Sequence, residues 1–129
     1  MRRITALLTA TALLLTVGVP TVLAKGGDGT RITLKAAKAF PAAKGNAKFK
    51  STAEERELQI EVEHIRRLAG KRVVFVVGGK KIATKKVSRL GTAQITRNSQ
   101  LGQFVPAVGA GTSVSVKTAA GVLIVKGSF

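Results

Sequence analysis

The chain of 129 residues carries 22 Lys and Arg against 6 Asp and Glu, a formal net charge of +16 at pH 7. It contains no cysteine, tyrosine or tryptophan, so disulfide bonds, thiolate metal ligands and a cysteine nucleophile are excluded. A charge of this size on a short chain favours association with polyanions or anionic surfaces, although it also keeps a protein soluble without any partner.

The N-terminal residues have the pattern of a secretory signal peptide. A positive start of two arginines precedes an apolar run over residues 4–19, and Pro20 ends the run before a Val-Leu-Ala stretch that closes at Ala24. This pattern predicts export with cleavage after Ala24, because the run is shorter than the roughly 20 apolar residues of a membrane span. Cleavage removes the two arginines and leaves residues 25–129 as a single domain with a formal charge of +14. The expected location is periplasmic, cell-surface or extracellular.

The mature chain begins with a predicted strand. After a Gly-rich entry over residues 25–30, residues 31–35 alternate apolar and polar side chains, which is the pattern of a half-buried strand. Residues 36–45 are interrupted by Pro41, so we expect a basic loop with about one helical turn.

Residues 46–65 predict a β-hairpin. Apolar and polar side chains alternate in both arms, and a turn over residues 53–56 sets Phe49 opposite Leu58 or Ile60. Five of the six carboxylates lie in this segment: Glu54, Glu55, Glu57, Glu61 and Glu63. Two glutamates can act as acid and base in an enzyme, but their position on a solvated strand face beside lysines favours ion pairing.

The middle of the chain predicts a three-stranded meander that organises the domain. Residues 72–77 are β-branched and aromatic, and Gly78-Gly79 supplies the two positive φ angles of a tight hairpin turn. Two further strands are expected over residues 80–87 and 92–96.

The second strand of the meander is crowded by four lysines. Strict alternation places Lys80 and Lys86 on one face and Lys81 and Lys85 on the other. Because both faces cannot then line a core, the strand is expected at an edge of the sheet, where lysines also block pairing with another chain.

The predicted core and the C-terminal segments complete the fold. Residues 98–111 contain Pro106 and are expected to lie as a loop across one end of the core, before strands over residues 113–117 and 122–125, the last buried on both faces. Phe75 is expected to be buried either on the other side of the sheet from the predicted core or under the loop that contains Phe104. That core comprises Leu58, Ile60, Val62, Val74, Val76, Ile95, Val114 and Val116.

Short strands separated by regular turns define the expected fold class. They predict an all-β protein, an antiparallel β-sandwich of seven or eight strands that is immunoglobulin-like in architecture. The alternative is a small closed barrel of the oligonucleotide-binding (OB) type.

Residues that catalysis or metal binding would need are scarce. His64 is the one histidine, and its phase with an apolar stripe favours a position at the rim of the core. A Ser-His-Asp triad would need Asp28, in the Gly-rich entry, and a metal site would need glutamates from the other face of the strand. We therefore expect no enzyme activity, no metal and no cofactor.

The basic residues predict a surface for anionic polymers, unless they form only a solvated face. Sequence-tolerant nucleic-acid binders add exposed aromatic side chains for stacking, whereas Phe49 and Phe75 occupy core-facing positions. The expected partners are anionic polysaccharide, extracellular DNA held by its backbone, or an envelope surface, without specific nucleic-acid readout. The predicted residues are Arg66, Arg67, Lys71, Arg72, Lys80, Lys81, Lys85 and Lys86.

The glycine turns and core positions resemble those of known bacterial proteins. Residues 75–84, together with residues 90–93, are similar to a sequence pattern of bacterial immunoglobulin-like extracellular domains. Residues 31–129 resemble an uncharacterised set of exported bacterial single-domain β-sandwich proteins, and the matching stretches are residues 45–49, 58–63, 72–96, 105–108, 111–112 and 127–129. The resemblance implies an exported β-sandwich and no particular site, and in this chain lysines replace neutral residues of that set along the second meander strand.

These features together predict a non-catalytic exported interaction module that contacts anionic polymers or cell-envelope components. The alternative is a structural or adhesive extracellular domain that assembles by β-strand pairing. The oligomeric state stays open.

Cleavage of the signal peptide can be tested directly on exported material. N-terminal sequencing should begin at Lys25 or within about two residues of it, because the small residue at Ala24 marks the cleavage site. An intact Met1 in that material would contradict the predicted export.

Overall fold

The computed structural model describes residues 29–129. The predicted signal peptide, its cleavage site and Asp28 lie outside these residues. Within them the chain is all-β, with eight strands and two short 3-10 helices. The strands are β2 (Thr30–Ala36), β3 (Lys44–Ser51), β4 (Arg56–Glu63), β5 (Arg72–Val77), β6 (Lys80–Lys86), β7 (Ala93–Asn98), β8 (Ser113–Thr118) and β9 (Leu123–Ser128), and the helices are η2 (Arg66–Leu68) and η3 (Ser99–Leu101).

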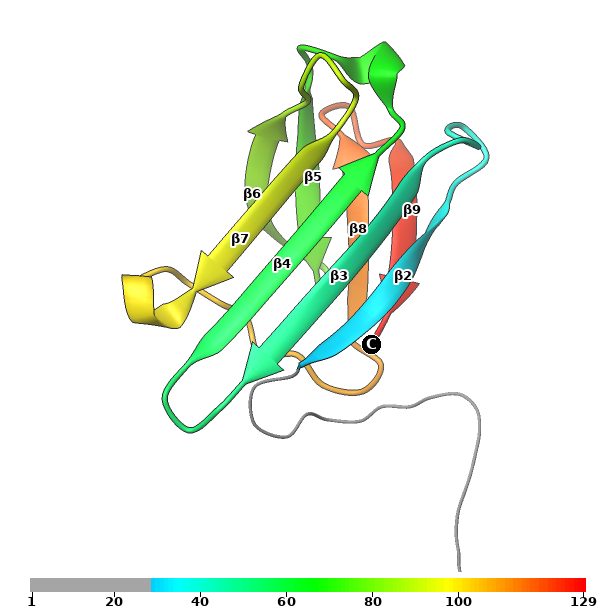
Figure 1. Cartoon of the computed structure of the whole chain (residues 1–129). Helices are drawn as coiled ribbons and strands as arrows, with labels where there is room; N and C mark the ends of the chain where they lie inside the picture. Colours follow the sequence, from blue (N-terminus) through cyan, green and yellow to red (C-terminus); the bar gives the residue numbers. More distant parts are fainter. Residues whose placement is uncertain (1–28) are drawn as a thin grey trace, which may run out of the picture.

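The eight strands form one antiparallel sheet that curls until it nearly closes. The strand order is β6-β5-β8-β9-β2-β3-β4-β7, and Figure 1 shows β2, β3, β4 and β7 in front of β6, β5, β8 and β9. The strand number agrees with the prediction. The immunoglobulin-like sandwich is not confirmed, because β2 pairs with both β3 and β9 and so makes the two layers one continuous sheet. The nearly closed, barrel-like sheet fits the alternative instead.

The junction between the two halves is narrow. β2 pairs with β9 through two registered pairs, Lys35 with Lys126 and Ala36 with Val125, and the next amide, of Ala37, donates to the Ile124 carbonyl at 2.8 Å. A β-carbon on Gly127 would lie 2.9 Å from the Thr33 carbonyl oxygen. The glycine therefore lets β2 approach β9 closely.

The predicted hairpin is present as β3 and β4. Phe49 lies opposite Leu58, and Lys48 lies opposite Gln59. Thr52 closes the turn, since its Oγ1 accepts hydrogen bonds from the backbone amides of Glu54 and Glu55 at 3.2 and 3.1 Å.

The predicted three-stranded meander is only half correct. β5 and β6 form the Gly78-Gly79 hairpin, and both glycines have positive φ. β7, however, leaves β6 and pairs with β4, where Ala93 and Ile95 lie opposite Val62 and Ile60. This pairing completes the β4 side of the core, which local sequence pattern alone could not reveal.

Most of the predicted core is confirmed, and β5 is the exception. Leu58, Ile60, Val62, Ile95, Val114 and Val116 are all buried. On β5 the buried residues are Val73, Phe75 and Val77, whereas Val74 and Val76 are half-buried on the outer face, so the prediction for those two was wrong. The reason is register: Phe75 lies opposite Val116 and Val77 opposite Val114 on β8, so β5 turns the same face inward as its neighbour.

A β-bulge changes the alternation on β9. Its pairing with β8 shifts after Val116, and the consecutive residues Ile124 and Val125 are both fully buried. The sequence predicts that the last strand is covered on both faces, but a bulge that turns two neighbouring side chains inward explains its apolar run, because Lys126 beside them is exposed.

The loop between β7 and β8 covers one end of the core, as predicted. Val105 is buried, Val108 packs against the core, and Phe104 is exposed.

Ile60 offers a test of the core. Replacing Ile60 by Ala should reduce the free energy of unfolding by about 2–5 kcal/mol, because the side chain is fully buried and its loss leaves a cavity. Urea unfolding measures the effect, and Val74→Ala, on the half-buried outer face of β5, is the control with a clearly smaller loss. Equal losses in the two variants would contradict this description of the core.

Gly91 offers a test of the turn that sends β7 to the other half. Its φ is +83°, and an added β-carbon would lie 2.6 Å from the Arg66 backbone nitrogen. Gly91→Ala should therefore destabilise the fold by more than the roughly 1–2 kcal/mol of left-handed strain alone. Gly70→Ala is the matched control, since Gly70 has φ +81° and a β-carbon there would meet nothing within 4 Å. Similar thermal stabilities of the two variants would show that the close contact is absent.

Candidate anion-binding surface

The lysines of β6 do not share faces as strict alternation predicts. The pairing between β5 and β6 skips Ile82, so Lys81 lies opposite Val76 and Lys86 lies opposite Arg72. Val76 and Arg72 are on the outer face of β5, and Lys81 and Lys86 therefore share that face. Lys80 and Lys85 pair instead with the inward-facing residues of β5. The prediction that Lys80 and Lys86 share a face was wrong because a bulge intervenes, while the predicted edge position of β6 is confirmed.

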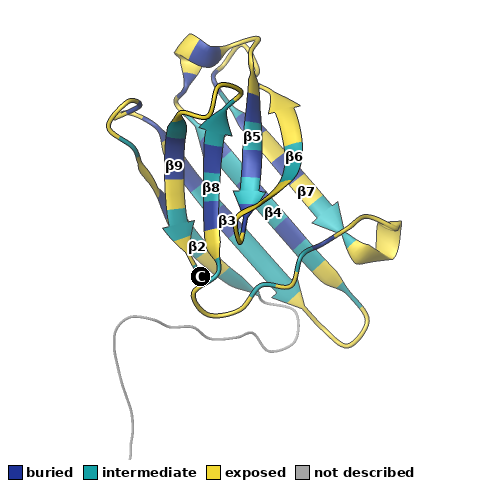
Figure 2. Cartoon of the chain, turned by 180° about the vertical axis from the view of Figure 1, so that it is seen from behind, coloured by how far each residue is buried: buried dark blue, intermediate teal, exposed yellow. Residues whose placement is uncertain are grey.

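The outer side of β6, β5, β8, β9 and the end of β2 forms a basic face. One lateral row runs across five strands, from Lys81 through Val76, Ser115 and Lys126 to Lys35. Figure 2 looks onto this side of the sheet. We define the basic face by its six outward cations, Lys35, Arg72, Lys81, Lys86, Lys117 and Lys126.

No acidic side chain of the described residues belongs to the basic face. The five glutamates in that part of the chain lie on β4 or in the turn before it. A Debye length of about 8 Å at physiological salt allows the two outer surfaces of the molecule to keep distinct local potentials. The basic face is therefore a surface of single-sign charge.

The opposite surface, on β2, β3, β4 and β7, is a mixed face. Lys44 lies directly opposite Glu63, and Lys50 lies opposite Glu57 with their charged atoms 3.5 Å apart. We define the mixed face by the outward residues Arg31, Lys44, Lys48, Lys50, Glu57, Glu61 and Glu63. Its four cations lie on β2 and β3, and its three carboxylates lie on the neighbouring β4, so opposite charges largely cancel on this face.

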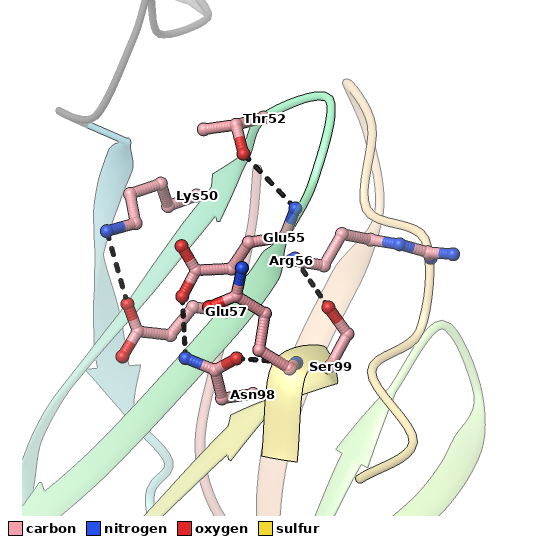
Figure 3. A network of polar contacts seen from close by, with 8 residues as sticks. Lys50, Thr52, Glu55, Arg56, Glu57, Asn98 and Ser99 are labelled. Atoms are coloured by element: carbon pink, nitrogen blue, oxygen red, sulfur yellow. Dashed lines mark hydrogen bonds and ion pairs between the residues drawn. The ribbon is translucent and has the colours of Figure 1, made fainter. Parts of the chain in front are cut away.

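The glutamates near the β3–β4 turn serve structural contacts. Glu55 accepts a hydrogen bond from the Asn98 amide at 2.7 Å, and the backbone amide of Arg56 donates to Ser99 Oγ at 2.8 Å. Figure 3 shows these two contacts, which tie the β3–β4 turn to the start of η3, and the Lys50–Glu57 pair, which joins β3 to β4. The Lys50–Glu57 pair is the kind of ion pairing that the sequence favoured, and the hydrogen bonds of Glu55 and Arg56 add to it.

His64 does not lie at the rim of the core. It is exposed, with φ +64°, and the next residue, Ile65, is buried in its place. The chain turns at His64, so the apolar stripe of β4 ends at Val62 and does not include His64. No group of three or more His, Cys, Asp or Glu among residues 29–129 has a spacing that could hold a metal ion.

The eight predicted binding residues fall into three places. Arg72, Lys81 and Lys86 lie on the basic face, and Lys80 and Lys85 lie toward the inner side of the β6 edge. Arg66, Arg67 and Lys71 lie in the segment between β4 and β5.

Two of these predicted cations contact aromatic rings. Arg67 lies 4.3 Å over the Phe40 ring and donates to the Ala39 carbonyl, so its guanidinium is occupied by the 37–43 loop. The Lys80 ammonium lies 5.5 Å from the Phe104 ring.

Three cations of the basic face were missed from sequence: Lys35, Lys117 and Lys126. Each is separated along the chain from the lysine-rich strand β6. Alternation in residues 113–117 signalled that Lys117 points outward, but nothing in the sequence indicated that β2, β8 and β9 lie side by side with β5 and β6.

No family model, curated protein or solved structure matches the chain. No helix in the described part of the chain is both long and apolar enough to cross a membrane.

Proposed function

We propose that the protein is an exported, non-catalytic interaction module that binds anionic polymers through the basic face. The observation that carries the proposal is the separation of charge between the two outer surfaces: six cations and no acidic side chain of the described residues on one, and four cations with three carboxylates on the other. Charge of one sign over several strands attracts a polyanion and releases its counterions, so binding weakens as salt rises.

The partner class follows from the side chains around these cations. Phe75 is fully buried, Phe40, Phe49 and Phe129 pack into or against the core, and none of the four offers a free ring face for stacking with bases. Phe104 is exposed, but the ammonium group of Lys80 lies over its ring. A single ring is a poor platform for single-stranded nucleic acid, so anionic polysaccharide or an envelope surface is favoured over sequence-specific nucleic-acid binding. The expected export, which the resemblance to exported bacterial proteins also implies, agrees with a partner outside the cytoplasm.

A second candidate function is assembly by β-strand pairing. β6 and β7 end the strand order, and a groove of about 720 Å³ lies between them. Arg97 spans this gap, since its guanidinium donates to the Ile82 carbonyl of β6 at 3.0 Å. Free strand edges can accept another strand, but the lysines of β6 oppose such pairing.

A pair of charge-matched triple variants tests the proposal. Arg72→Gln/Lys81→Gln/Lys86→Gln should elute from a heparin column at clearly lower salt than the unmodified protein. Its slope of log affinity against log salt should fall by about 2–3, one unit for each lost contact. Arg31→Gln/Lys44→Gln/Lys48→Gln, the mixed-face control, removes the same charge and should change retention little.

Three results would count against the proposal. Elution of the unmodified protein near physiological salt would remove its support, and equal effects of the two variants would show that net charge alone governs binding. Unchanged retention together with new self-association of the first variant, measured by light scattering, would favour strand pairing.

A further inference from the structure

Two lysines face each other where the sheet is narrowest. Lys35 and Lys126 form one of the two registered pairs between β2 and β9. Like charges directly opposite each other on a sheet are destabilising, and no glutamate of the described residues is on this face to offset them. The pairing weakens a junction on which closure of the sheet depends, so a bound anion would relieve the repulsion.

The same lysines line a groove on the basic face. The groove has a volume of about 710 Å³ and crosses β2, β8 and β9. Lys117 is its third cation, and Leu123 contributes an apolar patch. Four hydroxyl groups complete the polar lining, those of Thr33, Ser113, Ser115 and Ser128.

The groups in this groove are arranged to share one ligand. Ser115 lies directly opposite Lys126, which lies directly opposite Lys35. Neighbouring strands are about 4.8 Å apart, so an oxyanion above β9 is within reach of both ammonium groups and the Ser115 hydroxyl. Ammonium and hydroxyl groups both donate hydrogen bonds to an anionic oxygen.

The residues that line the groove also indicate which kind of polymer bears the anionic group. No aromatic side chain lines the groove within the described residues, so base stacking is not offered there. Hydroxyl groups spread over three strands can instead hydrogen-bond to a hydroxyl-rich polymer. This chemistry fits a sugar ester.

We propose that the β2–β8–β9 groove binds a tetrahedral oxyanion, a sulfate or phosphate ester on a polysaccharide, between Lys35 and Lys126. The inference rests on the proposed function and gives it a defined site. Because the ligand bridges two strands of the junction, its binding also stabilises the closed sheet, by the linkage that holds for any ligand of the native state.

The test uses three variants of the purified protein. The groove variant is Lys35→Gln/Lys117→Gln/Lys126→Gln, and the mixed-face control defined above removes the same charge elsewhere. A neutral variant, Ser115→Ala/Ser128→Ala, removes two hydroxyl groups and no charge. Calorimetric titration with heparin, phosphorylated dextran and duplex DNA at about 150 mM salt gives the affinities.

The groove variant should lose about tenfold or more in affinity for heparin or for phosphorylated dextran, and the preferred polymer identifies the ester. The neutral variant should lose about three- to tenfold, which net charge cannot explain. The mixed-face control should stay within about twofold of the unmodified protein. Without ligand, the groove variant should unfold at the same temperature or higher, because the repulsion between Lys35 and Lys126 is gone.

Two outcomes overturn the inference while the proposed function stands. One is full binding by the groove variant together with lost binding by Arg72→Gln/Lys81→Gln/Lys86→Gln. The other is equal affinity for DNA and both polysaccharides, with no effect of the neutral variant. If the unmodified protein binds none of the three polymers, the proposed function and the groove fail together.

Discussion

The pairing of β2 with two neighbours is the constraint on which the rest of the structure depends. β2 follows β3 along most of its length and reaches β9 only at its end. This short contact joins two four-stranded halves into one sheet, and the two halves together enclose the core. Gly127 is part of the same constraint, because a side chain there would collide with the backbone of β2. Closure therefore depends on a narrow contact with little sequence tolerance.

Strand order also determines where charge is placed. The glutamates belong to β4 and its preceding turn, and β4 lies between β3 and β7. Their carboxylates therefore neutralise lysines of β3 and are kept from β5, β8 and β9. Opposite charges on the mixed face give modest cross-strand stabilisation. On the basic face the cations repel one another, without a visible structural benefit. Proteins tolerate such local costs at functional sites, and this contrast connects the fold to the proposed binding of polyanions.

Local patterns predicted individual elements better than their partners. The β3–β4 hairpin could be predicted because its apolar and charged faces alternate in both arms, but two registers were left, with Phe49 opposite Leu58 or Ile60, and the structure has Leu58. The turn at Gly91 was also visible, but a turn does not specify whether the next strand pairs with the previous strand. β7 pairs with β4 because Ala93 and Ile95 complete the buried surface over Val62 and Ile60. In the same way, the inward face of β5 follows from Val114 and Val116 on β8, far away in sequence.

The sequence by itself determined the strand-forming segments, the buried faces of β4 and β8, the edge position of β6 and the excess of positive charge. Tertiary structure decided which strands are neighbours, which side of β5 is buried and which lysines share a surface. The bulge at Ile82 regroups the β6 lysines, and the junction brings Lys35 beside Lys126. The physical reason is that backbone hydrogen bonds between strands are nearly the same for every residue type. The neighbours of each strand are therefore selected by the burial of side chains across the completed sheet. No local segment of the sequence contains those contacts.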